Sequence, residues 1–161
     1  MKKRVVLICV SIIYSLFLIF VLFLKGNRGI LSNATFTEYI SAMCNFIPFA
    51  TITEYIKAIS NHSMNIIIPI ENVGGNFILF MPFAVIMYIS TRMKEWKFLL
   101  ILFGLLFIIE VAQLLTRLGS FDIDDFILNM TGAAFAYWLA SLIHKKNSVK
   151  QNRKWFKNDR R

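Results

Sequence analysis

The feature that most constrains this chain is a series of four apolar stretches, each close to the length of a membrane-spanning helix. An α-helix needs about 20 consecutive apolar residues to cross the hydrocarbon core of a bilayer. The four stretches cover residues 5–24, 73–90, 96–116 and 126–143. The first of them carries no charged side chain. The sequence therefore predicts an all-α integral membrane protein, built as a small bundle of four transmembrane helices.

The composition excludes an ordinary soluble domain. Hydrophobic residues make up 57% of the 161 positions and the mean hydropathy is +0.62, both above the range of soluble globular proteins. No linker rich in proline, glycine or serine and no internal repeat divides the sequence, so residues 1–161 are expected to form one membrane domain. The two cysteines, Cys9 and Cys44, are too few for a disulfide framework and are expected to be free thiols.

The first apolar stretch is expected to be a retained anchor. Its basic start, residues 2–4, is also typical of a secretory signal peptide. However, its apolar run is long for such a peptide, and residues 24–27 lack the small side chains of a cleavage site.

Basic residues are distributed unevenly between the two sides of the predicted bundle. Residues 1–4, 91–97 and 144–161 hold 14 of the 18 basic residues and two of the nine acidic residues, a net charge of +12. The remainder of the chain has a net charge of −3. Because Lys and Arg accumulate in cytoplasmic loops, both termini are expected in the cytoplasm and the loop 25–71 outside.

The tail 144–161 bears on the choice of partner. A pI near 9.8 would suggest nucleic-acid binding in a soluble protein. Here the basic run follows a membrane span directly, where each Lys or Arg is worth about 1 kcal/mol against anionic lipid. Membrane lipids are therefore the expected partners of the tail, and nucleic acid is not.

The outer loop 25–71 is too apolar for a simple hydrophilic connection. Residues 42–52 are hydrophobic but too short to span, and Pro48 interrupts them. We expect a short interfacial or re-entrant element there, followed by a turn or two of helix over residues 53–60.

Three polar clusters fall at similar depth near the outer ends of the last three spans. They are Asn72 with Asn76; Glu110, Gln113 and Arg117; and Asp122, Asp124, Asp125 and Asn129. Within each cluster the spacing of three, four or seven residues places most members on one helix face. At 1.5 Å per residue they lie roughly 5–10 Å below the outer surface. Polar groups at such a depth normally face a protein interior or a wet cavity, so we expect the clusters to meet.

Small residues accompany the clusters. They include Gly74, Gly75, Gly132 and Ala133. Small side chains let helix backbones approach closely in lipid, which would bring the polar groups together. Pro82 is expected only to kink the second span.

Each cluster also has a structural interpretation. Asp122 and Asp124 stand where a helix cap would stand, so Asp125, which shares a face with Asn129, is the stronger site candidate. Asn72 and Asn76 could be interhelical hydrogen bonders. A carboxylate inside an apolar helix has to be protonated, paired or bound to a cation, and for Glu110 the structural alternative is an ion pair with Arg117.

The residue types limit the chemistry. Carboxylate and amide oxygens are hard ligands that suit Mg²⁺ or Ca²⁺, so a divalent cation is a possible cofactor, with four candidate ligands. These are Glu110, Asp122, Asp124 and Asp125. The same four carboxyl groups are the candidate catalytic residues, with Glu110 as acid or base, and Arg117 is a candidate clamp for an anion.

Four motifs in this chain resemble the VanZ-like family of small bacterial membrane proteins. They are Asn45–Phe49, the pair Asn72–Asn76 and Phe80–Phe83, Glu110-x-x-Gln113, and Phe121–Asp125 followed by Asn129-x-x-Gly132. Ala84 departs from the glycine expected after Pro-Phe, a small-for-small change. The family name comes from resistance to the lipoglycopeptide teicoplanin. The resemblance implies a bacterial cell-membrane protein with a role at the outer face in such resistance or in cell-envelope biology, and a lid formed by the loop around Pro48.

The sequence leaves two main functions open. One is a membrane-embedded hydrolase or transferase acting on a lipid-linked envelope precursor. The other is a protein that binds the precursor or the lipoglycopeptide antibiotic and changes no bond; a structural partner subunit is a third possibility. The candidate substrate-binding residues are Asn45, Asn72, Asn76, Gln113, Arg117 and Asn129.

Overall fold

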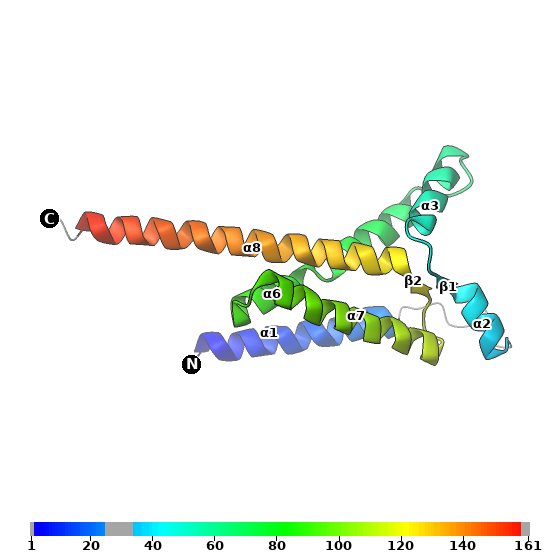
Figure 1. The fold of residues 1–161 in the computed structure, drawn as a ribbon, viewed down its shortest axis with the longest axis horizontal. Helices are drawn as coiled ribbons and strands as arrows, with labels where there is room; N and C mark the ends of the chain where they lie inside the picture. The colour runs from blue at the N-terminus through cyan, green and yellow to red at the C-terminus, as the bar shows by residue number, and fades with distance from the viewer. Residues whose placement is uncertain (1, 25–33, 159–161) are drawn as a thin grey trace.

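The computed structural model describes residues 2–24 and 34–158. Four of its helices, α1, α6, α7 and α8, run along the long axis of the molecule (Figure 1). The first, α1 (Lys2–Ile19), begins at the same end of the bundle at which the last, α8 (Ile123–Asn158), finishes. The short helices α2 and α3 lie at the opposite end, beside a small strand pair.

Four helical segments of the described chain are long and apolar enough to cross a membrane, which confirms the all-α membrane fold. They cover Val5–Phe23, Ile67–Thr91, Glu95–Thr116 and Ile123–Ser148. In the first, α1 continues as a π-helical segment, η1 (Phe20–Leu24), and the third is α7 (Glu95–Thr116).

The second span is assembled from several helical pieces. They are α4 (Ile67–Pro69), η2 (Ile70–Gly74), α5 (Gly75–Leu79) and α6 (Met81–Thr91). The break falls at Phe80, and Pro82 stands in the first turn of α6, where its missing N–H costs no hydrogen bond. The span begins at residue 67, earlier than the expected 73, because the π-helical segment carries the helix back to Pro69.

The fourth span is also longer than its hydropathy indicated. α8 has 36 residues, which is about 54 Å of helix, against about 30 Å for the hydrocarbon core. It begins three residues before the expected Phe126 and continues well beyond residue 143 into the basic tail. The apolar run therefore identified the membrane-embedded part of a longer helix.

The described part of the loop between the first and second spans, from residue 34, contains two helices separated by a two-residue strand. α2 (Phe36–Met43) starts at a capping box formed by Thr35 and Glu38, which satisfies two free backbone amides. The strand β1 (Cys44–Asn45) pairs in parallel with β2 (Phe121–Asp122), and α3 (Ala50–Ser60) follows. Residues 42–52 do not form one element. They contain the end of α2, the strand β1, a sharp turn and the start of α3. The helix expected over residues 53–60 is confirmed as part of α3.

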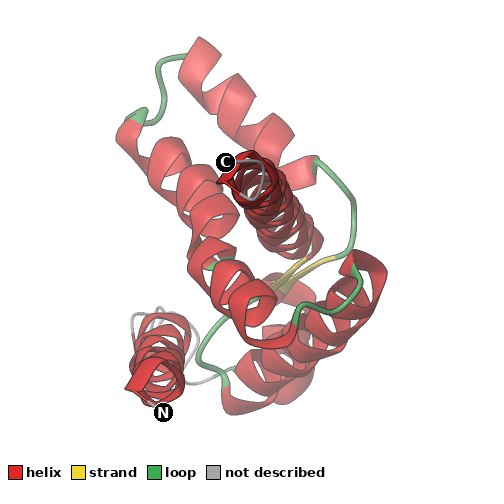
Figure 2. Cartoon of the chain, turned by 90° about the vertical axis from the view of Figure 1, so that its left-hand side faces the viewer, coloured by secondary structure: helices red, strands yellow, loops and turns green. Residues whose placement is uncertain are grey.

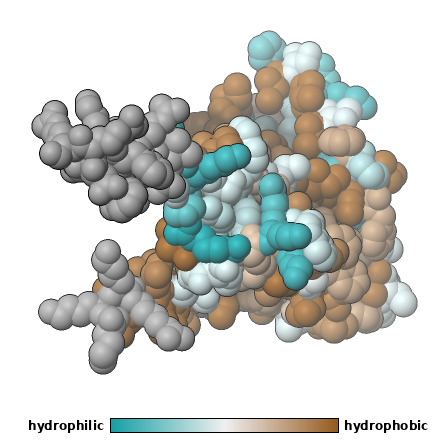
Figure 3. Space-filling model, turned by 60° about the vertical axis from the view of Figure 1, so that its left-hand side comes forward, coloured by the Kyte–Doolittle hydropathy of each residue, from teal (hydrophilic) through white to brown (hydrophobic). Residues whose placement is uncertain are grey.

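The core lies between α6, α7 and α8. Phe98 and Tyr137 are buried and stack with ring centroids 4.3 Å apart, and the Tyr137 hydroxyl donates to the Met93 carbonyl at 2.6 Å. Large apolar side chains on the outward faces of α1 and α7 are exposed, as lipid contact requires. In the view of Figure 3, hydrophobic side chains cover much of the flank, and hydrophilic ones gather near the end where α1 begins.

α1 lies to one side of the other spans (Figure 2). Leu18 of this helix is buried, and the Tyr14 hydroxyl donates to the Leu79 carbonyl. Nearer its other end, the Gln113 amide donates to the Leu22 carbonyl at 2.8 Å. Hydrogen bonds at two positions along the first span therefore supplement its limited apolar contact with the other spans.

The closest backbone approach at a described glycine joins α8 to α5. A Cβ atom added at Gly132 would lie 1.7 Å from the Phe77 carbonyl oxygen, so the helices can touch here only because this residue has no side chain. Gly74 and Gly75 have open space where a Cβ atom would stand. Of the three glycines expected to allow close packing, Gly132 is the one that does.

Candidate functional site

The polar clusters meet at the end of the bundle that carries α2 and α3. The Asn76 amide, on α5, donates a hydrogen bond to the Asp125 carboxylate, on the first turn of α8. The Gly132 contact lies two turns further along α8 and holds the same two helices together. The predicted convergence of the second and fourth spans is thus present as a direct side-chain contact.

Asp122 joins three segments of the chain. It precedes α8, and its carboxylate accepts the Asp124 backbone N–H at 2.9 Å, which caps the helix. The same carboxylate accepts the Thr51 hydroxyl at 2.6 Å and the Asn45 amide at 3.5 Å. The parallel register of β1 and β2 places Asn45 opposite Asp122. The helix-cap interpretation of Asp122 is therefore confirmed.

Asp124 caps a different helix from the one expected. Its side chain is 1% exposed, and its two carboxylate oxygens accept the backbone amides of Phe49 and Ile52 at the start of α3. Phe49 adopts the left-handed conformation, with φ 65°, which costs a non-glycine residue of the order of 1 kcal/mol. Asp124 thus stabilises a strained turn and fixes the loop around Pro48 to α8.

Tyr55 and Asn72 form the side of the cluster toward α3. The Asn72 amide donates to the Tyr55 hydroxyl at 2.9 Å. Burial raises the pKa of the Tyr55 phenol above its usual value, and the carboxylates of Asp125 and Asp122 act in the same direction. The phenol therefore stays neutral near both carboxylates and remains a hydrogen-bond donor.

Glu110 and Asn129 are buried polar residues, and each leaves one side-chain oxygen unused. Glu110 is 6% exposed and Asn129 is 3% exposed. In the described part of the chain, Oε2 of Glu110 and Oδ1 of Asn129 have no hydrogen-bond partner. An unsatisfied buried acceptor costs about 1–3 kcal/mol, so such groups need a reason.

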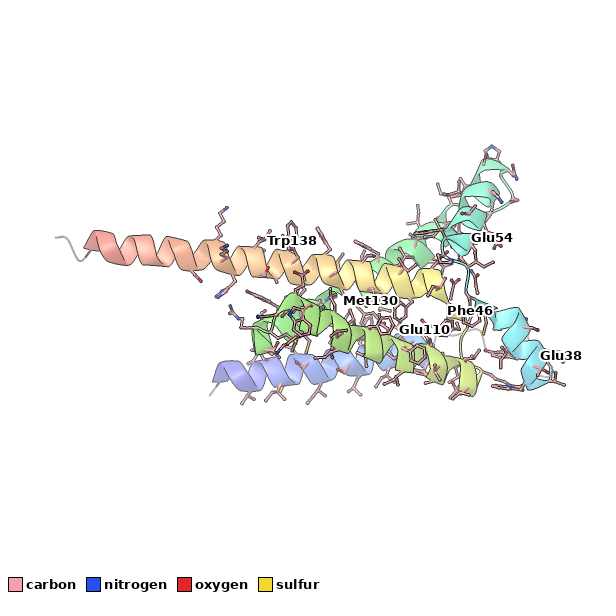
Figure 4. The ribbon with its side chains drawn as sticks, viewed as in Figure 1. Glu38, Phe46, Glu54, Glu110, Met130 and Trp138 are labelled. Atoms are coloured by element: carbon pink, nitrogen blue, oxygen red, sulfur yellow. The ribbon has the colours of Figure 1, made fainter. Side chains whose placement is uncertain are left out.

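Both residues border Asp125. The Asn129 amide donates to the Asp125 backbone carbonyl at 2.8 Å. The Glu110 carboxyl group lies near the Asp122 backbone amide and within electrostatic reach of the Asp125 and Asp122 carboxylates. Figure 4 shows Glu110 between α7 and α8. The two unused acceptors therefore belong to the same cluster as the Asn76–Asp125 contact.

Gln113 and Arg117 were expected in the site, but the side chains of both residues make contacts elsewhere. Gln113 bonds the end of the first span, as described above. Arg117 ends α7 in a left-handed conformation, with φ 53°, and its guanidinium donates to the Ala34 carbonyl at 3.0 Å. It also lies over the rings of Phe36 and Tyr39. The ion pair considered for Glu110 and Arg117 is not formed, because these contacts hold Arg117 to the segment that leads into α2.

The contacts of the four candidate metal ligands leave few free oxygens. Among residues 2–24 and 34–158, no group of three or more His, Cys, Asp or Glu side chains is arranged to hold a metal ion. Asp124 uses both carboxylate oxygens on backbone amides, and Asp122 bonds Thr51, Asn45 and the α8 backbone. Glu110 and Asp125 remain as the carboxyl groups with an oxygen available to a ligand.

Two side chains of the cluster were missed in the sequence. Thr51 and Tyr55 contact Asp122 and Asn72, respectively. They are spaced i and i+4 on α3, so both face the same side of that helix. This spacing is a usable signal, but only once α3 is known to fold back against the start of α8.

Comparison with known proteins agrees with these features. The model of the VanZ/LLP1 family matches residues 11–144, a range that begins inside the first span and includes the apolar stretches of the other three spans and every residue of the cluster. None of the curated proteins and none of the solved structures matches the chain. The chain therefore belongs to the VanZ/LLP1 family and is a multi-pass membrane protein of the teicoplanin-resistance type at the level of that family.

Proposed function

We propose that this protein binds the polar head of a lipid-linked envelope intermediate and so limits the access of a lipoglycopeptide antibiotic to it. The observation that carries the proposal is the pair of unused buried acceptors, Glu110 Oε2 and Asn129 Oδ1, beside Asp125. A polar cluster that served only to hold helices together would satisfy its acceptors internally. Acceptors held open at a cost in stability are typical of a site that a ligand completes.

The site is proposed to open toward the outer leaflet of a bacterial cell membrane. Basic residues concentrate at the end of the bundle where α1 begins and in the tail of α8, and such ends are cytoplasmic. The cluster lies at the other end, under α2 and α3. An envelope lipid exposes its head group at that level.

The contacts within the cluster favour binding over catalysis. Asp122 and Asp124 act as helix caps, so two of the four candidate catalytic carboxyl groups already have structural partners. Glu110 and Asp125 could still transfer a proton, and turnover of the bound intermediate is the outcome that would identify an enzyme. Asn45, Asn72 and Asn76 then orient the carboxylates and α3, and a bound ligand meets Glu110 and Asn129.

The proposal can be tested with purified protein in lipid nanodiscs that contain a lipid-linked peptidoglycan precursor. We expect the wild-type protein to retain the precursor through gentle detergent extraction, and Glu110→Gln to retain about tenfold less, since one charge-assisted hydrogen bond is lost. Glu54→Gln is the matched control because Glu54 is exposed on α3. Equal retention by all three proteins would contradict the proposal, and a new product would show catalysis.

A further inference from the structure

The cluster around Asp125 contains several neighbouring carboxyl groups and no described basic side chain. The acidic neighbours of Glu110 are Asp125 and Asp122, and those of Asp125 include Asp122 and Asp124. Arg117, the nearest basic residue along α7, lies over Phe36 and Tyr39. A ligand that enters this site meets carboxylates and amide oxygens, and no cation.

Hydrogen-bond acceptors also outnumber donors here. Glu110 Oε2 and Asn129 Oδ1 are unused. Asp125 accepts the Asn76 amide on Oδ1, and no described group donates to its other oxygen. Three residues that neighbour one another on α7 and α8 thus each have an acceptor atom available to a ligand.

We propose that the group bound by Glu110, Asn129 and Asp125 is a primary ammonium. This inference rests on the proposed function and names the chemical class of head group that the site selects. An ammonium brings three N–H donors, one for each available acceptor, and one positive charge. The positive charge also pairs with a carboxylate of the cluster, and a carboxylate without a partner is costly in a medium of low dielectric constant.

Other head-group chemistries fit the cluster less well. A phosphate or carboxylate would be repelled by Asp122 and Asp125. A quaternary ammonium has the charge but no N–H to donate. A hydroxyl group has a donor but leaves the charge of the carboxylates uncompensated. The amine can belong to a lipid head group or to a soluble molecule, and the experiment separates the two.

The test uses the full chain in nanodiscs of dioleoylphosphatidylcholine, each doped with an equal trace of one probe lipid. The probes are dioleoylphosphatidylethanolamine, its N-acetyl derivative and dioleoylphosphatidylglycerol. Lipid that stays with the protein after gentle detergent extraction is quantified. We expect the ethanolamine lipid to be enriched about tenfold over the other two, because it alone can form charge-assisted N–H bonds.

Variants connect the enrichment to the named residues. Glu110→Gln and Asn129→Leu should each abolish the preference, and Glu54→Gln should leave it unchanged; an unaltered size-exclusion profile excludes misfolding as the cause. Displacement of the retained lipid by millimolar soluble ethanolamine would show that the amine alone is recognised. Resistance to displacement would show that the protein recognises the amine as part of a lipid. Either result supports an ammonium site.

Two results would overturn the inference, and they differ in what they say about the proposed function. If the glycerol or N-acetylated lipid is enriched as strongly as the ethanolamine lipid and Glu110→Gln removes both, the site binds neutral hydrogen-bond donors and head-group binding stands. If no probe is enriched and retention of the lipid-linked precursor is also insensitive to Glu110→Gln, both the ammonium site and the proposed function fail.

Discussion

The Asn76 side-chain amide donates a hydrogen bond to the Asp125 carboxylate, and this contact joins the second membrane span to the fourth at the polar end of the bundle. The bond satisfies one oxygen of a carboxylate that neighbours two other acidic groups. Asn76 therefore holds Asp125 in a fixed position next to Glu110 and Asn129, where a ligand can use the remaining acceptors.

The Asn76–Asp125 contact should make the effects of substituting these two residues on stability depend on each other. In a double-mutant cycle with Asn76→Ala and Asp125→Ala, we expect a coupling of about 1 kcal/mol, the size found for interhelical hydrogen bonds in membranes. Thermal or denaturant unfolding in detergent measures it. Strictly additive effects of the two substitutions would show that the bond contributes no stability.

Gly132→Ala should separate the helices that carry this contact. The new Cβ atom would lie 1.7 Å from the Phe77 carbonyl oxygen, and a backbone atom cannot rotate out of the way. We expect a loss of about 3 kcal/mol in unfolding free energy, at the upper end for overpacking.

Gly104→Ala provides the matched control for that substitution. Nothing lies within 4 Å of a Cβ atom at Gly104, so this change should be neutral or stabilising by about 0.5 kcal/mol through helix propensity. Equal effects of the two substitutions would contradict the close approach of α5 and α8.

Asp124→Ala should release the start of α3. The carboxylate accepts the amides of Phe49 and Ile52, and loss of a helix cap costs about 0.5–2 kcal/mol. Hydrogen exchange should therefore accelerate at residues 49–52 and not in the core of α7. Unchanged protection of these amides would show that the loop around Pro48 is held by other contacts, such as the packing of Phe46 on Phe121.

Arg117→Gln tests whether Arg117 takes no part in the binding site. The guanidinium contacts the Ala34 carbonyl and the rings of Phe36 and Tyr39, so its loss should loosen α2 and increase proteolysis of the outer loop. Retention of the lipid-linked precursor should stay within twofold of wild type. A loss of retention as large as that caused by Glu110→Gln would show that Arg117 belongs to the binding site.

The sequence was sufficient to predict the elements that depend on local hydrophobicity. Runs of apolar residues identified all four spans, because a lipid-facing helix has to be apolar over its whole embedded length. The spacing and depth of Asn76, Glu110, Asp125 and Asn129 were sufficient to predict that these side chains share one end of the bundle, because helix periodicity and polarity in lipid leave few other arrangements.

The contacts that depend on the loop between the first and second spans could not be predicted in this way. Asp124 stands at the start of α8 and has the sequence context of a cap for that helix, but it caps α3, which approaches through the β1–β2 pairing. Arg117 shares a helix face with Glu110 by spacing, but α7 ends in a left-handed turn at this residue and the side chain follows the loop. Both outcomes are set by contacts between residues about 70 or more positions apart.

The most direct test of the binding site is the effect of Glu110→Gln on stability and on ligand retention in the same preparation. The substitution keeps the shape of the side chain and removes an uncompensated carboxyl group. We predict that the unfolding midpoint in detergent stays equal or rises, while retention of the lipid-linked precursor falls about tenfold. A lower midpoint with retention unchanged per folded molecule would contradict the site and show that Glu110 serves only the fold.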